Sequence, residues 1–278
     1  MPRHMELLTI IYEDADLLVV HKPADLVCHP TKGDAYSSLI SRARLYLQSS
    51  PAGSMEPAPS PHLIHRLDRE TTGLVLMAKS PQAARQLGRI WEDRAVRKEY
   101  LAIVHGHVTP DEGIIDAPVG KDQASHVAIK DCVRQDGKPA RTEFLVERRF
   151  CSVGHASTPP DHLPGADDPQ PRAHERSHTG LFSLLRLHPM TGRKHQIRIH
   201  LAHFGHPIVG DKLYGGDPDL YLALVENRLT GEQRARLILP QHALHASRIQ
   251  FDWRGRSREF SAPPEAAFQE FINPANHT

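Results

Sequence analysis

The sequence predicts an α+β fold with a mixed, largely antiparallel sheet and flanking helices. Three observations lead to this fold class: apolar runs of strand length recur along the whole chain, few segments show helical spacing, and no strand–helix–strand unit repeats. With 278 residues, of which 39% are hydrophobic and 24% charged, the chain can bury a core of its own. We expect a single domain over residues 1–278.

Strands are predicted where apolar residues alternate or run continuously over a short stretch, at residues 7–12, 17–21, 73–78, 99–108, 141–149, 181–187 and 243–253. The first two form a hairpin, since four residues with three carboxylates separate them. Helices are predicted at residues 36–47, 81–91 and 193–204, with a short terminal helix after Pro263 and Pro264. Ser80 followed by Pro81 is typical of a helix start.

Two segments are predicted to lie outside regular structure. Prolines and small residues at 49–61 end the helix before them. At residues 152–179, proline, aspartate and histidine replace nearly every large apolar side chain, which predicts a mobile insertion between two strands. A structured loop that contacts RNA is the alternative for this insertion.

Several classes of protein are excluded by composition. No run approaches the roughly eighteen apolar residues of a membrane span, and the first ten residues lack a secretory signal. Cys28, Cys132 and Cys151 form no CxxC pair, so neither a disulfide framework nor a thiolate zinc site is indicated. We therefore expect a cytoplasmic protein that does not associate with membranes.

Positive charge is concentrated locally, although the net charge is only +1. One group lies in residues 85–98 and a second in residues 186–198; their members are Arg85, Arg89, Arg94, Arg97 and Lys98, then Arg186, Arg193, Lys194 and Arg198. Two positive faces are predicted, and ordinary solvated helix faces are the alternative.

The segment HRLDRETTGLVLMA at residues 65–78 carries the most chemistry. Asp68 precedes a predicted buried strand and is flanked by Arg66 and Arg69, whose charges favour an ionised carboxylate. Asp68 is thus a candidate nucleophile. Its alternative role is that of an aspartate that forms a turn or a helix cap.

Five segments together resemble the RluA-type family of pseudouridine synthases, in the family's order and over nearly the whole chain. HRLDRETTGLVLMAKS resembles its catalytic segment; the others are IIYEDADLLVVHKPADLVCHP, RKEYLAIVHG, TGRKHQIRIHLAHFGHPIVGDKLYG and QHALHASRIQF. Thr72 stands where the family often has serine, which keeps the hydroxyl. The family's frequent amino-terminal RNA-binding domain, of the S4 type, is not expected here, because the opening hairpin starts within ten residues of Met1.

The resemblance implies an isomerase that converts uridine to pseudouridine in ribosomal or transfer RNA. The bond between N1 and C1′ is broken and C5 is joined to C1′, with no cofactor and no metal. The implied fold is a bent sheet with a central catalytic cleft. Asp68 is implied to be the nucleophile or base, Tyr100 to stack on the target base, and Arg198 to pair with Asp68. Spacing alone would make Tyr100 a core aromatic.

Access to the base requires that it be flipped out of the RNA. By resemblance, Arg66 fills the gap that the base leaves, and its alternative is a phosphate contact. Further RNA contacts are predicted for Arg69, Arg193, Lys194 and His195. Ile208 and Val209 are predicted to form an apolar wall beside the base or to belong to the core, and His65 to support the catalytic loop by hydrogen bonding.

Two other functions are compatible with parts of the sequence. A noncatalytic RNA-binding or RNA-chaperone protein would use the same basic residues without needing Asp68. A metal hydrolase is suggested by the histidines at 188, 195, 200, 203 and 206, but no HExxH pattern accompanies them. We expect a monomer with no obligate protein partner.

Overall fold

The computed structural model describes residues 7–30, 36–49, 59–153 and 179–273. Nearly all of the predicted insertion at 152–179 lies outside the described residues. The chain divides into two compact units: Met1–Tyr100 with His245–Glu265, and Leu101–Leu244 with Ala266–Thr278. The prediction of a single catalytic domain with a central cleft concerns how the two units combine, and it stays a prediction.

The first unit is built on a mixed sheet. Its strands, in spatial order, are β1 (Thr9–Glu13), β2 (Leu17–Lys22), β4 (Thr72–Ala78) and β11 (Leu244–Trp253), with β12 (Arg256–Ser261) beside β11 and β3 (His62–Leu63) beside β4. The pair β4–β11 is parallel, whereas β1–β2, β2–β4, β3–β4 and β11–β12 are antiparallel. The predicted hairpin at the start of the chain is present.

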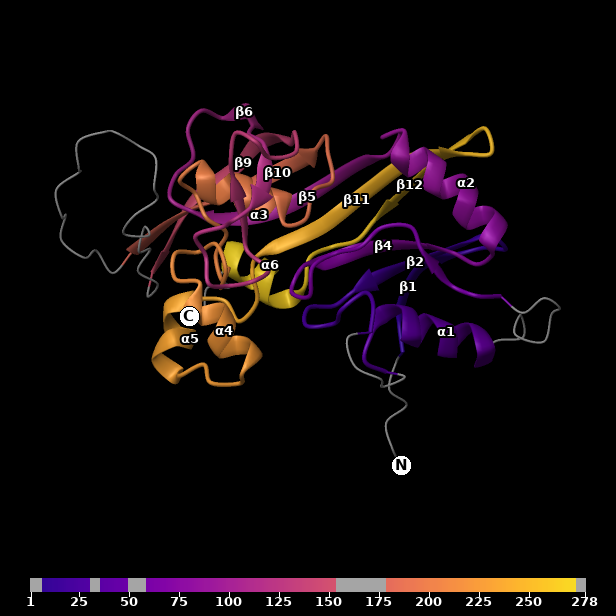
Figure 1. The fold of residues 1–278 in the computed structure, drawn as a ribbon, viewed down its shortest axis with the longest axis horizontal. Helices are drawn as coiled ribbons and strands as arrows, with labels where there is room; N and C mark the ends of the chain where they lie inside the picture. The colour runs from indigo at the N-terminus through magenta and orange to yellow at the C-terminus, as the bar shows by residue number, and fades with distance from the viewer. Residues whose placement is uncertain (1–6, 31–35, 50–58, 154–178, 274–278) are drawn as a thin grey trace. The chain divides into compact units, whose positions relative to one another are not determined.

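Helices α1 (Leu39–Ser49) and α2 (Pro81–Glu92) cover opposite faces of this sheet (Figure 1). Alternate side chains of β2 and β4 point to opposite helices: Leu17, Val19, Leu74 and Leu76 pack with Ala83 and Leu87 of α2, while Leu18, Val20, Val75 and Met77 pack with Leu39 and Ala43 of α1. A strand that is covered on both faces has no polar face, which explains why β2 and β4 read as continuous apolar runs.

The start of α2 agrees with the prediction made from Ser80 and Pro81. The Ser80 hydroxyl oxygen accepts a hydrogen bond from the backbone N–H of Ala83 at 3.2 Å. Pro81 occupies the first turn, where its missing N–H costs no helical hydrogen bond. This cap fixes the point at which the chain turns back along β4.

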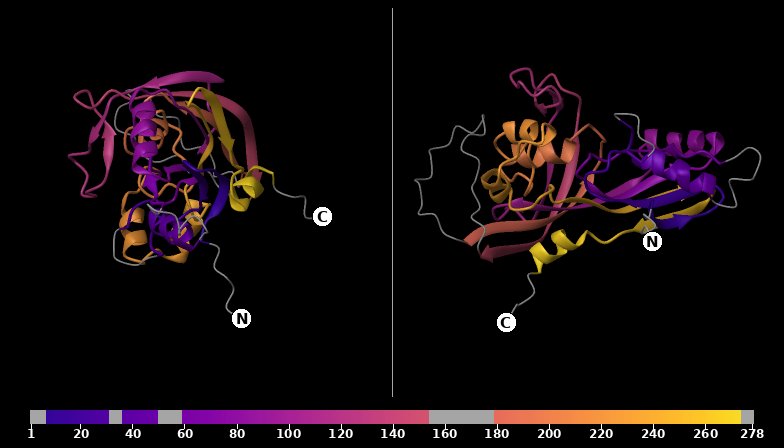
Figure 2. Two further views of the ribbon diagram at one scale, coloured as in Figure 1. Left: turned by 90° about the vertical axis from the view of Figure 1, so that its right-hand side faces the viewer. Right: turned by 90° about the horizontal axis from the view of Figure 1, so that it is seen from below.

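The second unit has a sheet with the order β5, β10, β9 and β6. Their bounds are β5 (Arg97–His105), β10 (Thr179–Pro189), β9 (Arg141–Val153) and β6 (Glu112–Asp116), and the first residues of β5 belong to the first unit. Strands β7 (Val119–Lys121) and β8 (Asp131–Val133) form a separate hairpin. The helices are α3 (Gln196–His203), α4 (Asp219–Val225), α5 (Gly231–Leu237) and α6 (Ala266–Ile272). Helix α6 lies against β9 and β10 (Figure 2), where Phe271 packs edge-on against Phe182.

The predicted fold class, α+β with a mixed sheet, is confirmed. All seven predicted strands are present, with shifted ends. The predicted helix at 193–204 begins only at Gln196, because His195 adopts a left-handed conformation with φ of 55°. None of the helices in the described ranges is long and apolar enough to cross a membrane.

Gly73 lets β4 and β11 come into contact directly after the loop that carries Asp68. Its φ is +109°, and a Cβ atom there would lie 2.3 Å from the carbonyl oxygen of Ala246. Both the backbone conformation and the close approach therefore require glycine at this position.

We predict that Gly73→Ala lowers the free energy of unfolding by about 2–4 kcal/mol, because the backbone must shift or the strands must separate. Urea denaturation measures the change. Gly88→Ala is the matched control, since a Cβ at this position in α2 meets nothing within 4 Å and alanine favours a helix by about 0.5–1 kcal/mol. Equal effects of the two substitutions would contradict the argument.

Candidate active site

Asp68 lies in the loop between β3 and β4, and we refer to residues 64–71 as the Asp68 loop. Leu67 is the anchor of this loop: it is 6% exposed and belongs to the core cluster that includes Val75 and Met77. Its neighbours on either side differ, because Asp68 is partly exposed and Arg66 and Arg69 are exposed. The loop thus buries one apolar side chain and presents a carboxylate and two guanidinium groups toward solvent.

A buried lysine holds the end of the Asp68 loop. Lys22 is completely buried, and its ammonium group donates hydrogen bonds to the carbonyl oxygens of Pro23 (2.7 Å), Leu26 (2.8 Å) and Arg69 (2.8 Å). Three donors meet three acceptors, so all the protons of the ammonium group are used. Nζ of Lys22 thus connects the end of β2, the turn after it and the end of the Asp68 loop through hydrogen bonds.

Lys22 keeps its charge near neutral pH. Burial lowers the pKa of Lys22 to about 8, although the acidic groups around it, Cys28, Glu265 and Asp68, act in the opposite direction. The attraction between Lys22 and Asp68 is mutual and favours an ionised carboxylate on Asp68. The sequence analysis missed this residue; its only signal was a lysine at the end of a strand with no polar face.

Two further side chains fix the loop. The Cys28 sulfur accepts a hydrogen bond from the Leu67 N–H at 3.4 Å. His65 Nε2 accepts one from the Leu76 N–H at 3.1 Å, and its ring stacks on Trp91 with the ring centres 4.5 Å apart. Burial, with a smaller contribution from the charge of Lys98, lowers the pKa of His65 to about 3. The ring is therefore neutral, as its acceptor role requires, and the predicted support of the loop by His65 is present.

Tyr100 packs against the same cluster as Leu67. Burial raises the pKa of Tyr100, and the negative charge of Asp68 raises it further. The phenol is consequently protonated at neutral pH and is able to donate a hydrogen bond. Packing against the core matches the role that spacing alone suggested, while stacking on a base stays a prediction.

Thr72 uses its hydroxyl in a buried network. It donates to Nδ1 of His245 at 2.8 Å, and Nε2 of His245 donates to the carbonyl oxygen of Ala262 at 2.9 Å. The carbonyl oxygen requires a proton on Nε2, and in a neutral ring Nδ1 is then the acceptor for the Thr72 hydroxyl. Burial lowers the pKa of His245 to about 4. A serine would supply the same hydroxyl, so the departure of Thr72 from the family pattern retains this contact.

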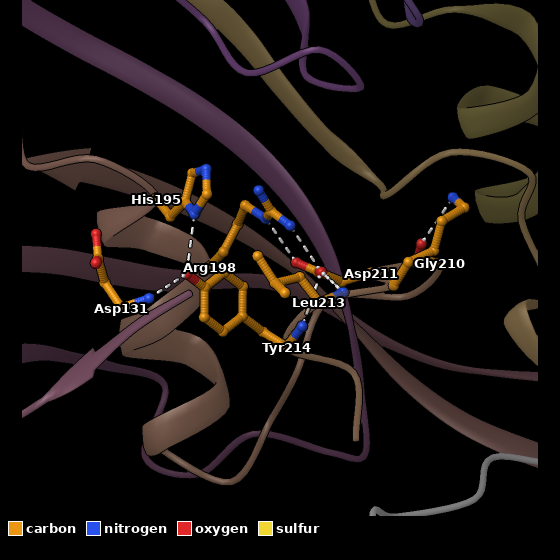
Figure 3. A network of polar contacts seen from close by, with 8 residues as sticks. Asp131, His195, Arg198, Gly210, Asp211, Leu213 and Tyr214 are labelled. Atoms are coloured by element: carbon orange, nitrogen blue, oxygen red, sulfur yellow. Dashed lines mark hydrogen bonds and ion pairs between the residues drawn. The ribbon is translucent and has the colours of Figure 1, made fainter. Parts of the chain in front are cut away.

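In the second unit, Arg198 forms a buried ion pair with Asp211 (Figure 3). Nε and Nη2 of Arg198 donate to the two carboxylate oxygens at 2.7 and 2.9 Å. Oδ1 of Asp211 also accepts from the N–H groups of Leu213 and Tyr214. Burial alone would raise the pKa of Asp211, but the charge and hydrogen bonds of Arg198 hold it well below its usual range. Asp211 is a partner that the sequence analysis did not identify.

Tyr214 extends this network toward the surface. The guanidinium carbon of Arg198 lies 5.0 Å from the centre of the Tyr214 ring, and the Tyr214 hydroxyl contacts His195 Nδ1 at 2.9 Å (Figure 3). The same hydroxyl accepts a hydrogen bond from the N–H of Asp131. His195, which was predicted to bind RNA, thus has a partner within the protein, and an RNA contact would add to this one.

Gln196 sets the conformation of the segment that leads into α3. Its Oε1 accepts from the Thr191 hydroxyl (2.7 Å) and from the Arg193 N–H (3.0 Å). Its Nε2 donates to the carbonyl oxygen of Arg141 and to the hydroxyl of Thr142. One buried amide therefore fixes the backbone from Thr191 to Gln196, which presents Arg193 and Lys194 next to α3.

The remaining predicted residues of this unit have identifiable surroundings. Arg193 donates to the carbonyl oxygen of Pro139, and Lys194 pairs with Asp131 at 2.8 Å while remaining exposed. Ile208 and Val209 are almost fully buried; the Val209 N–H donates to the carbonyl oxygen of Ile103, and the Val209 carbonyl oxygen accepts from the N–H of Ala243. A core role accounts for both residues; a base-facing role stays a prediction.

Three of the histidines that suggested a metal, at 195, 200 and 206, have hydrogen-bond partners within the protein. His200 contacts the Thr142 hydroxyl and the Ala117 carbonyl oxygen, each at 2.9 Å, and His206 contacts the His105 carbonyl oxygen at 2.8 Å. Within the described ranges, no group of three or more histidine, cysteine, aspartate or glutamate residues is arranged to hold a metal ion. These hydrogen bonds give His200 and His206 a structural role.

The predicted site residues are divided between the two units. Asp68, Arg66, Arg69 and Tyr100 belong to the first unit, whereas Arg193, Lys194, His195, Arg198, Ile208 and Val209 belong to the second. The pairing of Arg198 with Asp68 would join the units, and it stays a prediction. Each unit by itself already contains a charged group held in place by buried hydrogen bonds.

The buried ammonium group of Lys22 leads to a prediction about stability. Lys22→Met keeps a long unbranched side chain but leaves three carbonyl oxygens without a donor, so we expect the free energy of unfolding to fall by about 2–4 kcal/mol. Urea denaturation measures this change in the free energy of unfolding, and Lys138→Met, at an exposed lysine, is the control. A loss no larger than that of Lys138→Met would show that the three hydrogen bonds contribute little.

His245 leads to a prediction about pH. Its folded-state pKa of about 4 lies below the unfolded value of 6.5, so the unfolded chain binds the proton first as pH falls. As pH falls from 6.5 to 4, the protonation of His245 should therefore lower the free energy of unfolding by about 1.4 kcal/mol for each pH unit. Unfolding measured from pH 7.5 to 5 should show a smaller slope for His245→Asn than for the wild type; identical slopes would argue against a neutral buried ring.

Comparison with known proteins identifies the family. Residues 16–203 match the family model described as RNA pseudouridylate synthase. The chain is 34% identical over 246 residues to ribosomal large subunit pseudouridine synthase D of Nitrosomonas europaea, covering 87% of this chain and 57% of that protein. It is 31% identical to an uncharacterized RNA pseudouridine synthase of Bacillus subtilis, covering 95% of this chain and 72% of the relative.

Solved structures agree at the level of the fold. Human RNA pseudouridylate synthase domain containing 4 superposes with a TM-score of 0.64 at 23% identity, covering 95% of this chain and 91% of that one. The human domain containing 1 protein gives a TM-score of 0.63 at 24% identity and covers 92% and 83%. The five segments of the sequence, the family match and the fold agree, and the chain belongs to the RNA pseudouridylate synthase family, which confirms the predicted family and its class of enzyme.

Proposed function

We propose that this protein isomerises uridine to pseudouridine in the RNA of the large ribosomal subunit, with Asp68 as the group that starts the reaction. The observation that carries the proposal is the Asp68 loop: a carboxylate beside the buried charge of Lys22, on a segment fixed by Leu67, Cys28 and His65. The choice of RNA rests on the names of relatives, of which several are ribosomal large subunit enzymes.

The reaction needs no net oxidant or reductant. The N1–C1′ bond breaks, the C5–C1′ bond forms, a proton leaves C5 and a proton is gained at N1, so substrate and product have the same composition. Protein groups that orient the base and move one proton are sufficient in principle. We therefore propose that neither a metal nor an organic cofactor takes part.

Each side chain of the first unit has a role in this scheme. Arg66 is exposed next to Leu67 and fills the space of the flipped nucleotide, with its planar guanidinium stacked between bases. Arg69, exposed on the other side of Asp68, binds a phosphate. Tyr100 enters as a neutral phenol because its pKa is raised, which suits stacking and hydrogen-bond donation.

The second unit supplies the arginine. Arg198 already uses two N–H groups on Asp211, which fixes the plane of its guanidinium. We propose that its remaining donor capacity holds the Asp68 carboxylate in the productive orientation. Ile208 and Val209 form the apolar wall next to the base, and Arg193, Lys194 and His195 contact the RNA beside it.

The cellular setting is also part of the proposal. The three cysteines are free thiols, which is typical of a reducing compartment. We propose a cytoplasmic enzyme that acts as a monomer. Gel filtration at micromolar concentration measures the oligomeric state.

Tritium release from RNA labelled at C5 of uridine tests the activity. Wild type should release tritium from large-subunit RNA, and Asp68→Asn should reduce the rate by at least about a hundredfold, because the amide keeps the size of the side chain but not its charge. Asp252→Asn, at an exposed carboxylate of β11, is the matched control and should retain the rate. Urea denaturation checks that each variant is folded.

The outcomes separate the proposals. Normal release by folded Asp68→Asn would contradict the role of Asp68. Release by the wild type from transfer RNA alone would overturn the choice of RNA and leave the activity standing. If neither RNA releases tritium while both bind tightly, the noncatalytic RNA-binding protein becomes the better description.

A further inference from the structure

Four exposed arginines near the Asp68 loop have no partner within the described structure. Arg85 and Arg89 lie on α2, Arg94 directly follows its end, and Arg97 begins β5. None of their side chains makes a hydrogen bond or ion pair with any described residue. We refer to these four residues as the arginine face.

Some other arginines of the chain are paired with carboxylates among the described residues, whether half-buried or exposed. Arg134, Arg149 and Arg186 each contact a carboxylate, as do Arg228, Arg248 and Arg254. The two carboxylates nearest to the arginine face in the sequence, Glu92 and Asp93, are also exposed, and no ion pair between them and the face occurs among the described residues. The guanidinium groups of this face are therefore available to a ligand.

The arginine face begins next to the Asp68 loop. Helix α2 follows β4 after a short turn and packs on it, and its end reaches the beginning of the Asp68 loop, where Ile64 and Trp91 pack on the same core cluster. The stacked rings of His65 and Trp91 are direct evidence of this contact. Arg89 and Arg94 flank Trp91 in the sequence, Arg97 precedes Lys98, whose charge acts on His65, and Arg85 lies one turn further back along the helix.

The composition of α2 shows which face is turned to solvent. Ala83 and Leu87 are buried, whereas Arg85 and Arg89, four residues apart and hence on one side of the helix, are exposed. Their exposed neighbours include Gln82 and Gln86. Like charges at this spacing destabilise a helix by about 0.2–0.5 kcal/mol, and no internal partner offsets this here.

Positive charge extends from this face into the site. Burial lowers the pKa of Lys98, and the charge of Arg94 lowers it further. Lys98 in turn contributes, after burial, to the lowered pKa of His65. The charge of Arg94 therefore acts on Lys98, and the charge of Lys98 acts on His65, which supports the Asp68 loop.

We propose that the arginine face binds the phosphate backbone of the RNA that flanks the target nucleotide, leading away from the Asp68 loop. The inference rests on the proposed function, since it takes RNA as the substrate. A guanidinium presents a planar pair of donors to phosphate oxygens. Protein partners bind through apolar cores, and the exposed side of α2 presents arginine and glutamine instead.

The test compares pairs of substitutions that remove the same charge. Arg85→Gln/Arg89→Gln and Arg94→Gln/Arg97→Gln neutralise the face two residues at a time. Arg234→Gln/Arg236→Gln is the matched control, because these exposed arginines of α5 also lack a described partner and the change in net charge is equal. Urea denaturation verifies that all three variants fold.

Binding of large-subunit RNA is measured against salt concentration, and tritium release against RNA concentration. Each lost phosphate contact should reduce the slope of log K against log salt by about one, so each face variant should lose about two. Kd and KM should rise on the order of tenfold while kcat changes far less, because the contacts lie beside the reacting base. The α5 control should match the wild type in slope, Kd and KM.

The arms distinguish this inference from the proposed function. If the wild type releases tritium but the face variants match the α5 control, the arginine face does not bind RNA and the proposed activity stands. If the wild type binds RNA without releasing tritium while the face variants still lose about two units of slope, the proposed activity fails and the RNA surface stands. A fall in kcat with unchanged KM would also overturn the inference, since it would place these arginines in the chemical step.

Discussion

The buried ammonium group of Lys22 is the interaction on which the candidate active site most depends. Removing a charge from water costs several kcal/mol, and that cost is offset only if every proton finds an acceptor. The carbonyl oxygens of Pro23, Leu26 and Arg69 come from two separate segments, so the lysine is satisfied only when the Asp68 loop has its native shape. The folded loop and the buried charge are thus conditions for each other.

The second unit follows the same principle with a different pair of groups. Arg198 and Asp211 are both buried, and each meets the charge of the other through two hydrogen bonds. Asp211 also accepts two backbone N–H groups, which ties the loop after Val209 to α3. An arginine fixed in this way loses little conformational freedom when it meets a substrate or another side chain, which favours precise positioning.

The sequence was a good guide to elements whose cause is local. Ser80 and Pro81 identified the start of α2, because a helix cap depends on neighbouring residues alone. The continuous apolar runs of β2 and β4 identified strands covered on both faces. Helices α4 and α5 were missed, since each is only seven residues long and packs mainly in a small cluster with its neighbour. The short strands β3, β6, β7, β8 and β12 were missed for a similar reason: their partners, not their own composition, define them.

By itself, the sequence determined the fold class, the family and the identity of the candidate residues, because motif order and hydrophobic pattern are properties of the chain read in one dimension. Only the tertiary structure decided which groups support them. Thr72 and His245 are 173 residues apart along the chain, whereas Arg198 and Asp211 are only 13 residues apart. No rule of sequence spacing selects such partners, and the same holds for Lys22. Hydrogen bonds and burial act through distance in space, and that distance is set when the strands and helices pack.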